Sequence, residues 1–130
     1  MTPSEIQILI VDDVQTVRVQ VKEILKSCGF EKIQVAGNGV EALSTLKSEK
    51  FHCVVSDWYM EPMSGLELLK KVREDAELKN LAFVMLTAEC TKEKVIEAIK
   101  AGLDDYVMKP FSKEHAQLKL MNTLLKRKMI

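Results

Sequence analysis

Cysteine is scarce in this chain of 130 residues, and the three cysteines lie far apart. Because Cys28, Cys53 and Cys90 form no Cys-x-x-Cys pair, the sequence predicts neither a disulfide framework nor a zinc site. A reduced, cytoplasmic compartment is the expectation that follows. No segment approaches the roughly 18 apolar residues that a membrane span needs, and residues 1–7 lack the long apolar core of a secretory signal.

An excess of one charge is also lacking, because nineteen Lys and Arg balance nineteen Asp and Glu. This balance argues against binding nucleic acid through a general electrostatic footprint. The local excess at Lys126-Arg127-Lys128 is explained by cations near the negative end of a helix dipole. Glycine is sparse as well, and Gly37-Asn38-Gly39 lacks the lysine and the spacing of a P-loop, so we interpret it as a turn.

Strand-like and helix-like segments alternate five times along the chain. Apolar runs predict strands at residues 6–11, 33–36, 53–56, 81–86 and 106–108. Apolar residues at helical spacing follow each run, and four of the predicted helices are preceded by a residue that favours helix N-termini, namely Asn38, Ser64, Thr91 and Ser112. Glu41 and Glu67 complete the capping-box pattern with the first two of these residues.

Five β-α units predict an α/β fold, in which right-handed crossovers place helices on both faces of a parallel sheet. The economical arrangement is the doubly wound, flavodoxin-like sheet with strand order 2-1-3-4-5. A chain of this length is expected to form one domain, residues 1–130, that buries about two-thirds of the surface of its unfolded chain.

Polar residues follow four of the predicted strands at the point where each strand ends. They are Asp12 and Asp13, then Asp57, then Thr87, and finally Lys109. In an open parallel sheet, ligands bind outside the carboxyl ends of the strands, where the strand order reverses. Strands 1 and 3 are neighbours at that reversal, so the first two acids are expected to face the third.

This set of side chains suits phosphoryl transfer. Two carboxylates about 4 Å apart repel by roughly 4 kcal/mol at an effective dielectric near 20, so a cation must neutralise them. An all-oxygen cluster favours a hard cation, and Mg²⁺ is the expected one. Lys109 supplies a point charge for a phosphoryl oxygen, the Thr87 hydroxyl can donate to another, and one carboxylate can act as the nucleophile that forms an acyl phosphate.

Each residue also has a simpler interpretation. Two aspartates after a strand are often a helix cap, Thr87 could cap the fourth helix, and Lys109 before Pro110 could be a solvated loop lysine. Capping alone does not require acids, a hydroxyl and an ammonium at four strand ends together. His52 and His115 stand apart from the acids in the pattern, and we interpret neither as a ligand.

The residues resemble those of response-regulator receiver domains from about residue 6 to the C-terminus. The motifs that carry the resemblance are Leu9-Ile10-Val11-Asp12-Asp13, Asn38-Gly39-Val40-Glu41-Ala42-Leu43, Asp57-Trp58-Tyr59-Met60 with Gly65, Leu86-Thr87-Ala88, Gly102-Leu103-Asp104-Asp105-Tyr106 and Lys109-Pro110-Phe111. The resemblance implies that Asp57 is the phosphoacceptor. It implies Asp13, Asp57 and the Tyr59 backbone carbonyl as direct Mg²⁺ ligands, with Asp12 acting mainly through water.

The same resemblance implies that Thr87 and Lys109 contact the phosphoryl group, that Tyr106 is a rotameric switch, and that Lys109–Pro110 is a cis peptide bond. Within the family, the chain is most similar to the single-domain chemotaxis regulators. It is therefore expected to have no output domain, to take phosphate from a sensor histidine kinase, and to act on the flagellar motor switch through its fourth helix, fifth strand and fifth helix. A dedicated phosphatase is a further possible partner, and the expected protein is a monomeric phosphoacceptor rather than an enzyme.

Two alternatives remain open. The chain could be a phosphorelay intermediate that passes phosphate to a histidine phosphotransfer protein. It could also be a phosphatase with an aspartate nucleophile, although such enzymes usually carry a second acid two residues after the nucleophile, where this chain has Tyr59. Two departures from the family pattern affect the acceptor loop: Glu61 separates Met60 from Pro62, and Tyr59 is larger than the usual residue. We predict that Tyr59 and Glu89 tune the rate at which water reaches the acyl phosphate.

Overall fold

Five parallel strands form one sheet, in the order β2-β1-β3-β4-β5, within the residues that the structure describes. This structure is a computed structural model that describes residues 1–88 and 91–130. The strands are β1 (Gln7–Val11), β2 (Lys32–Ala36), β3 (Cys53–Asp57), β4 (Ala82–Thr87) and β5 (Asp105–Met108). The predicted α/β fold and strand order are confirmed, and the strand boundaries differ from the prediction by one residue at most.

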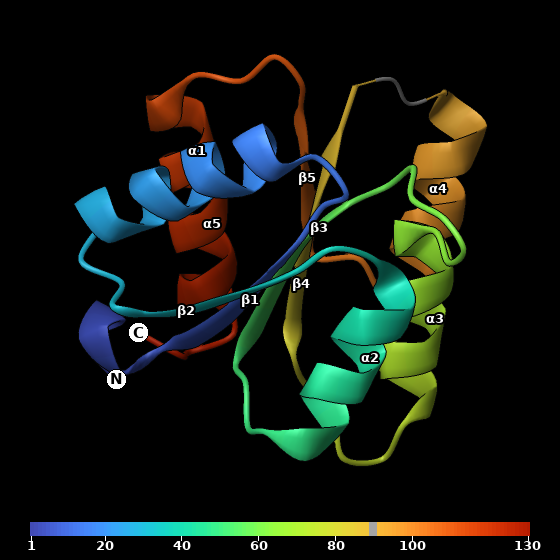
Figure 1. Ribbon diagram of the computed structural model, residues 1–130, viewed down its shortest axis with the longest axis horizontal. Helices are drawn as coiled ribbons and strands as arrows, with labels where there is room; N and C mark the ends of the chain where they lie inside the picture. The colour runs from blue at the N-terminus through green and yellow to red at the C-terminus, as the bar shows by residue number, and fades with distance from the viewer. Residues whose placement is uncertain (89–90) are drawn as a thin grey trace.

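The helices cover both faces of the sheet. They are the short η1 (Pro3–Glu5) followed by α1 (Gln15–Ser27), α2 (Gly39–Ser48), α3 (Gly65–Glu74), α4 (Lys92–Lys100) and α5 (Lys113–Lys126). Figure 1 shows α1 and α5 on one face and α2, α3 and α4 on the other. This is the doubly wound arrangement, with the carboxyl ends of all five strands at one edge of the sheet.

Side-chain caps begin four of these helices at the predicted residues. Ser64 and Glu67 form the reciprocal capping box of α3. The Asn38 side chain accepts a hydrogen bond from the Glu41 N–H, but the Glu41 carboxylate binds the Gly37 N–H at 3.1 Å instead of returning to Asn38. The second predicted capping box is therefore a one-way cap. Thr91 and Ser112 cap α4 and α5.

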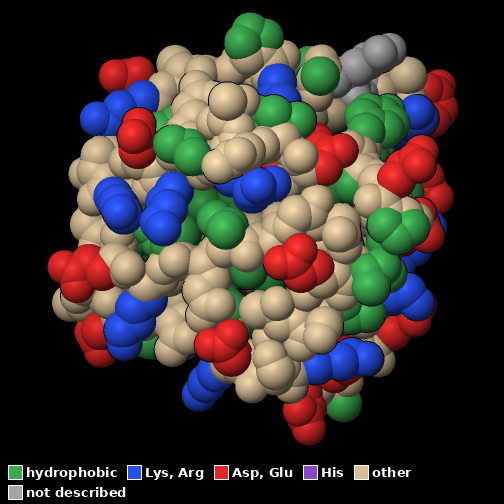
Figure 2. Space-filling view, viewed as in Figure 1, with side chains coloured by type: hydrophobic (Ala, Val, Ile, Leu, Met, Phe, Trp, Pro, Cys, Tyr) green, Lys and Arg blue, Asp and Glu red, His purple; other side chains and the backbone are tan. Residues whose placement is uncertain are grey.

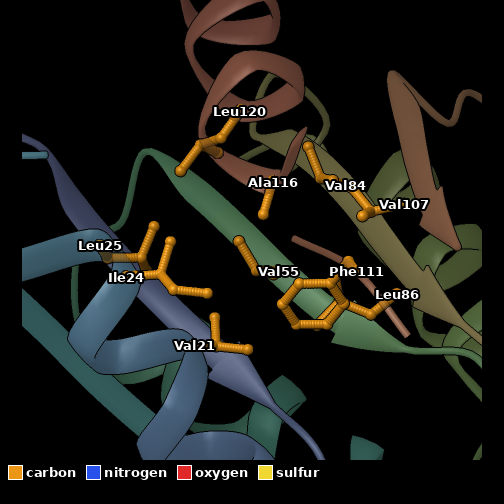
Figure 3. A pocket seen from close by; sticks show the side chains of 10 residues that line it. All are labelled: Val21, Ile24, Leu25, Val55, Val84, Leu86, Val107, Phe111, Ala116 and Leu120. Carbon is orange, nitrogen blue, oxygen red and sulfur yellow. The ribbon is translucent and has the colours of Figure 1, made fainter. Parts of the chain in front are cut away.

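Two clusters of buried side chains lie on opposite faces of the sheet in the described part of the chain. Adjacent residues of β3 alternate between them, with Val54 in the α2-α3-α4 cluster and Val55 in the α1-α5 cluster. The second cluster contains a cavity of about 20 Å³, which Figure 3 shows between α1, α5 and the sheet. This is little more than the space of one water, and its apolar lining offers water no hydrogen-bond partner.

The C-terminal end of α5 is fixed to the amino-terminal edge of the sheet by charged side chains. The Arg127 Nε lies 2.7 Å from the Asp104 carboxylate, and the Arg73 guanidinium binds the same carboxylate at 3.1 Å. Asp104 also accepts the Phe83 N–H at 2.8 Å, where β4 begins. Arg127 is therefore part of a specific ion-pair network as well as a cation near a helix end.

The remaining sequence-level expectations concern cysteines, charge and membranes. Cys28 and Cys53 are both free, and Cys90 lies outside the described residues. Burial raises the pKa of the Cys53 thiol to about 12, so this thiol stays protonated. Figure 2 shows basic and acidic side chains interspersed over the viewed face. None of the helices in the described residues has the length and apolar character needed to cross a bilayer.

Candidate functional site

Three carboxylates meet at the carboxyl edge of the sheet. Asp12 and Asp13 follow β1, Asp57 is the last residue of β3, and these two strands are paired with Val11 opposite Ser56. One carboxylate oxygen from each acid lies within 4.8 Å of the other two. Asp12 and Asp57 are buried whereas Asp13 is exposed, so the cluster opens to solvent on the Asp13 side. The predicted meeting of these acids is confirmed.

Lys109 reaches this cluster from the end of the edge strand β5. It follows β5, and its Nζ lies 3.2 Å from Asp12 Oδ2 and 3.4 Å from Asp57 Oδ1. Its backbone N–H donates to the Thr87 carbonyl at 2.7 Å, which fixes the start of the β5–α5 loop against the end of β4. The Lys109–Pro110 bond is cis, as the family resemblance implied. The alternative of a solvated loop lysine is therefore wrong.

The environment of Asp57 keeps its charge poorly solvated. Burial raises the pKa of its carboxyl above the ordinary value, the Lys109 ammonium opposes that shift, and the charge of Asp12 adds to it. Asp57 Oδ1 accepts the Trp58 N–H at 2.8 Å, so one oxygen is held in place by the backbone. A buried anion with two acidic neighbours is stabilised by any added positive charge.

Thr87 occupies the strand end beside Asp57. Leu86 pairs with Asp57 in the sheet, and Thr87 is the next residue and the last of β4. Its side chain is fully buried. The residue that caps α4 is Thr91, so the alternative in which Thr87 caps this helix is wrong. The buried hydroxyl therefore lies one strand away from Asp57, as the sequence predicted.

Comparison with known proteins decides the family. A family model described as the response regulator receiver domain matches residues 8–121. The chain belongs to this receiver-domain family. It is 48% identical over 106 residues to chemotaxis protein CheY-3 of Vibrio cholerae, and the match covers 82% of each chain. It is 44% identical to chemotaxis protein CheY of Pseudomonas aeruginosa over 106 residues, which are 82% of this chain and 86% of that protein.

Solved structures give the same answer. The receiver domain superposes on the chemotaxis protein CheY4 of Vibrio cholerae with a TM-score of 0.85 at 33% identity, covering 92% of this chain and 98% of that one. A CheY-like receiver domain from Methanospirillum hungatei matches with a TM-score of 0.86 at 28% identity over 95% of this chain. The family, its CheY-like character and its fold are thus confirmed, whereas the roles of individual site residues remain predictions.

The loop after β3 carries the two departures from the family pattern. Tyr59 is 48% exposed, and its hydroxyl accepts a hydrogen bond from Lys94 Nζ at 2.9 Å. Tyr59 also lines a surface groove together with Asp13, Met60 and other residues of the loop. Glu61–Pro62 is a second cis peptide bond. The other residue that we predicted to tune the rate, Glu89, lies outside the described residues.

Tyr106 and His52 have different surroundings in the structure. Tyr106 is half-buried in β5, packs against the α2-α3-α4 cluster and has Lys119 Nζ 5.8 Å from its ring centroid. Its contact with this cluster, which includes Ala98 of α4, suits the predicted switch role without testing it. His52 uses Nδ1 to accept the Gln7 N–H at 3.0 Å, and burial lowers the pKa of this imidazole. This histidine is a structural residue, and neither it nor His115 belongs to the acid cluster among the described residues.

Two residues position the site but were assigned no role in it from the sequence. A side chain at Gly65 would place its Cβ 2.1 Å from the Asp57 carbonyl oxygen, so only glycine allows α3 to begin against the end of β3. The Gly65 N–H also donates to the Trp58 carbonyl at 2.7 Å. Arg18 donates from Nη1 to the Asp12 carbonyl at 2.6 Å. Gly65 was recognised only as part of a family motif, and Arg18 gave no signal beyond helical spacing.

Proposed function

We propose that this receiver domain is a phosphorylation-activated response regulator that accepts a phosphoryl group on Asp57 from a histidine of a sensor kinase. The observation that carries the proposal is the buried Asp57 carboxylate at the strand-order reversal, with Lys109 Nζ 3.4 Å away. An Asp57 oxygen forms the new bond to phosphorus while the bond from phosphorus to the histidine nitrogen breaks. The product is an acyl phosphate, and catalysis consists of positioning and charge neutralisation.

The donor set fits a magnesium ion. Among the described residues, three acids with oxygens within 4.8 Å face one ammonium, which leaves the cluster with excess negative charge and only hard ligands. In the proposed site, Asp13, Asp57 and the Tyr59 backbone carbonyl would hold Mg²⁺ directly, and Asp12 would act mainly through water. When bound, the ion neutralises charge on the carboxylates and on phosphoryl oxygens. Thr87 and Lys109 contact the remaining phosphoryl oxygens.

The signalling surface of this proposal is formed by α4, β5 and α5. It carries exposed apolar side chains, among them Ile96 and Ile99 on α4 and Met108 on β5. Exposed apolar side chains on one surface suit a protein partner. In the proposed switch, Thr87 moves toward the phosphoryl oxygens and Tyr106 turns into the space that this movement leaves, which changes the surface beside α4.

The similarity to CheY proteins of Vibrio cholerae and Pseudomonas aeruginosa supports a chemotaxis pathway, with a kinase of the chemotaxis type and the flagellar motor switch as target. A dedicated phosphatase is a further proposed partner, and the formation of a single receiver domain by residues 1–130 stays a prediction. Binding tests separate this function from the phosphorelay alternative. A motor-switch peptide should bind better after phosphorylation, whereas a relay intermediate should pass its phosphate to a histidine phosphotransfer protein.

The direct test uses a small phosphodonor such as acetyl phosphate with Mg²⁺. Intact-mass measurement and peptide mapping should find one phosphoryl group on Asp57, and none in Asp57→Asn. Modification that persists at a serine or threonine in this variant would contradict the assignment. Hydrolysis of an added phosphate ester at an enzymatic rate would instead favour the phosphatase alternative.

The metal assignment has its own test. Trp58 is buried next to Asp57, so Mg²⁺ binding should quench or shift its fluorescence. Removing a proposed ligand in Asp13→Ala should weaken the response strongly. A titration that is unchanged in this variant would place the cation elsewhere.

A further inference from the structure

A hydrogen bond connects the acceptor loop to α4. The Tyr59 hydroxyl, two residues beyond Asp57, accepts from Lys94 Nζ at 2.9 Å. The same Nζ lies 5.1 Å from the Tyr59 ring centroid. Because the ammonium is much closer to the oxygen than to the ring centre, it lies beyond the hydroxyl and not above the aromatic face. The contact is therefore a directed hydrogen bond that fixes where the end of the ring points.

This bond joins the two segments that follow β3 and β4. Tyr59 follows β3 and lines the same groove as Asp13, whereas Lys94 is in the first turn of α4, the helix that follows β4. β3 and β4 are neighbours, with Asp57 opposite Leu86. Figure 1 shows the loop after β3 approaching α4 at the carboxyl edge of the sheet. The link therefore lies at the carboxyl edge of the sheet, beside the groove that Tyr59 and Asp13 line.

We propose that Lys94 is a positioning residue that holds the Tyr59 ring across the entrance to Asp57 and thereby slows the approach of water to the phosphoryl group. This inference rests on the proposed function and adds a residue on α4 to it. Hydrolysis of an acyl phosphate on Asp57 needs a water in line with the phosphorus, on the side away from the Asp57 oxygen. A half-exposed phenol that is fixed at its hydroxyl covers that side more of the time than a free one.

The expected effect follows from the free energy of one hydrogen bond. A bond of this kind stabilises one arrangement by roughly 0.5–1.5 kcal/mol, which corresponds to a population ratio of about twofold to tenfold. Lys94→Met removes the donor and keeps the length of the stem. Tyr59→Phe removes the acceptor and keeps both the ring and the backbone carbonyl. Each variant should shorten the half-life of the phosphorylated protein by about twofold to tenfold.

The first experiment measures dephosphorylation without added phosphatase. The double variant should lose phosphate no faster than either single variant, and Lys94→Arg should stay within about twofold of the unchanged protein because it still donates. Lys92→Met removes an exposed lysine from the same turn of α4 and should have no effect. An unchanged rate in Lys94→Met, or effects that multiply in the double variant, would overturn the proposal.

A second experiment reads the entrance without phosphate chemistry. In Asp57→Cys, the introduced thiol is alkylated with iodoacetamide, and peptide mapping separates it from the natural cysteines. Adding Lys94→Met should raise the alkylation rate about twofold to tenfold, and adding Lys92→Met should leave it unchanged. Failure of Asp57 to accept phosphate would refute the proposed function but leave this readout intact. Equal alkylation rates with and without Lys94 would refute the positioning role.

Discussion

Replacing Asp57 by asparagine should make the protein more stable, although it removes the proposed phosphoacceptor. Each neighbouring acid has an oxygen no farther than 4.8 Å from Asp57, and at an effective dielectric of about 20 such a pair costs about 3.5 kcal/mol. Lys109 at 3.4 Å contributes about 5 kcal/mol of attraction. Two repulsions therefore exceed one attraction by about 2 kcal/mol, and the cost of burying the charge adds to this difference.

We expect Asp57→Asn to raise the free energy of unfolding by about 2 kcal/mol at neutral pH without Mg²⁺, measured by urea denaturation at low salt. The pKa of Asp57 is raised in the folded protein, so the native state binds a proton more tightly than the unfolded chain does. The unchanged protein therefore gains stability relative to the variant as the pH falls through the folded pKa, and the difference closes in acid.

Mg²⁺ should also reduce the difference in the free energy of unfolding between Asp57→Asn and the unchanged protein. The reason is that the ion stabilises only the protein that keeps all three acids. Glu23→Gln, an equally conservative change on the exposed side of α1, is the control and should leave stability within about 0.5 kcal/mol. An Asp57→Asn variant that is less stable than the unchanged protein at neutral pH would refute the electrostatic reasoning.

Three further changes test the scaffold. Gly65→Ala should cost about 3 kcal/mol or more and disturb the acceptor loop, since its Cβ would lie 2.1 Å from a backbone oxygen. Gly37→Ala should be mild, because the nearest atom to its Cβ would be 3.6 Å away. Equal thermal shifts in the two variants would contradict this expectation. Val55→Ile should stabilise by about 0.8 kcal/mol by filling the α1-α5 cavity, and Val54→Ile on the opposite face should not; a loss in the first variant would show that the cavity cannot accept a methyl group. Because the pKa of His52 is lowered in the folded protein, stability is lost as the pH falls through the ordinary histidine pKa, near 6.5. His52→Asn should remove this pH dependence from urea midpoints measured at several pH values. An identical pH profile in both proteins would contradict this expectation.

Much of the site could be predicted from the sequence because strand ends follow a geometric rule. Apolar runs locate the strands, right-handed crossovers restrict their order, and the carboxyl ends then bring Asp12, Asp57, Thr87 and Lys109 to one edge. None of these steps needs side-chain detail. The order of the strands alone brings together residues that are separated by as many as 97 positions, as in the Lys109–Asp12 contact.

The contacts that could not be predicted depend on how helices sit on the sheet. Gly65 matters because α3 begins close to the Asp57 carbonyl, and no local pattern reports that approach. Lys94 meets Tyr59 because α4 lies next to the loop after β3, which helical spacing does not reveal. The same holds for Arg127, whose specific partner Asp104 lies 23 positions earlier, and whose terminal charge alone suggested only a helix-end cation.

The central claim is that phosphorylation of Asp57 changes the surface formed by α4, β5 and α5. Heteronuclear NMR spectra of the protein with Mg²⁺, recorded before and after addition of a small phosphodonor, test it most directly. We predict shifts at Thr87 and Tyr106 and along the exposed side of α4 around Ile96 and Ile99, all absent in Asp57→Asn. Shifts confined to the acid cluster and Lys109, with α4 and Tyr106 unchanged, would contradict the proposed switch.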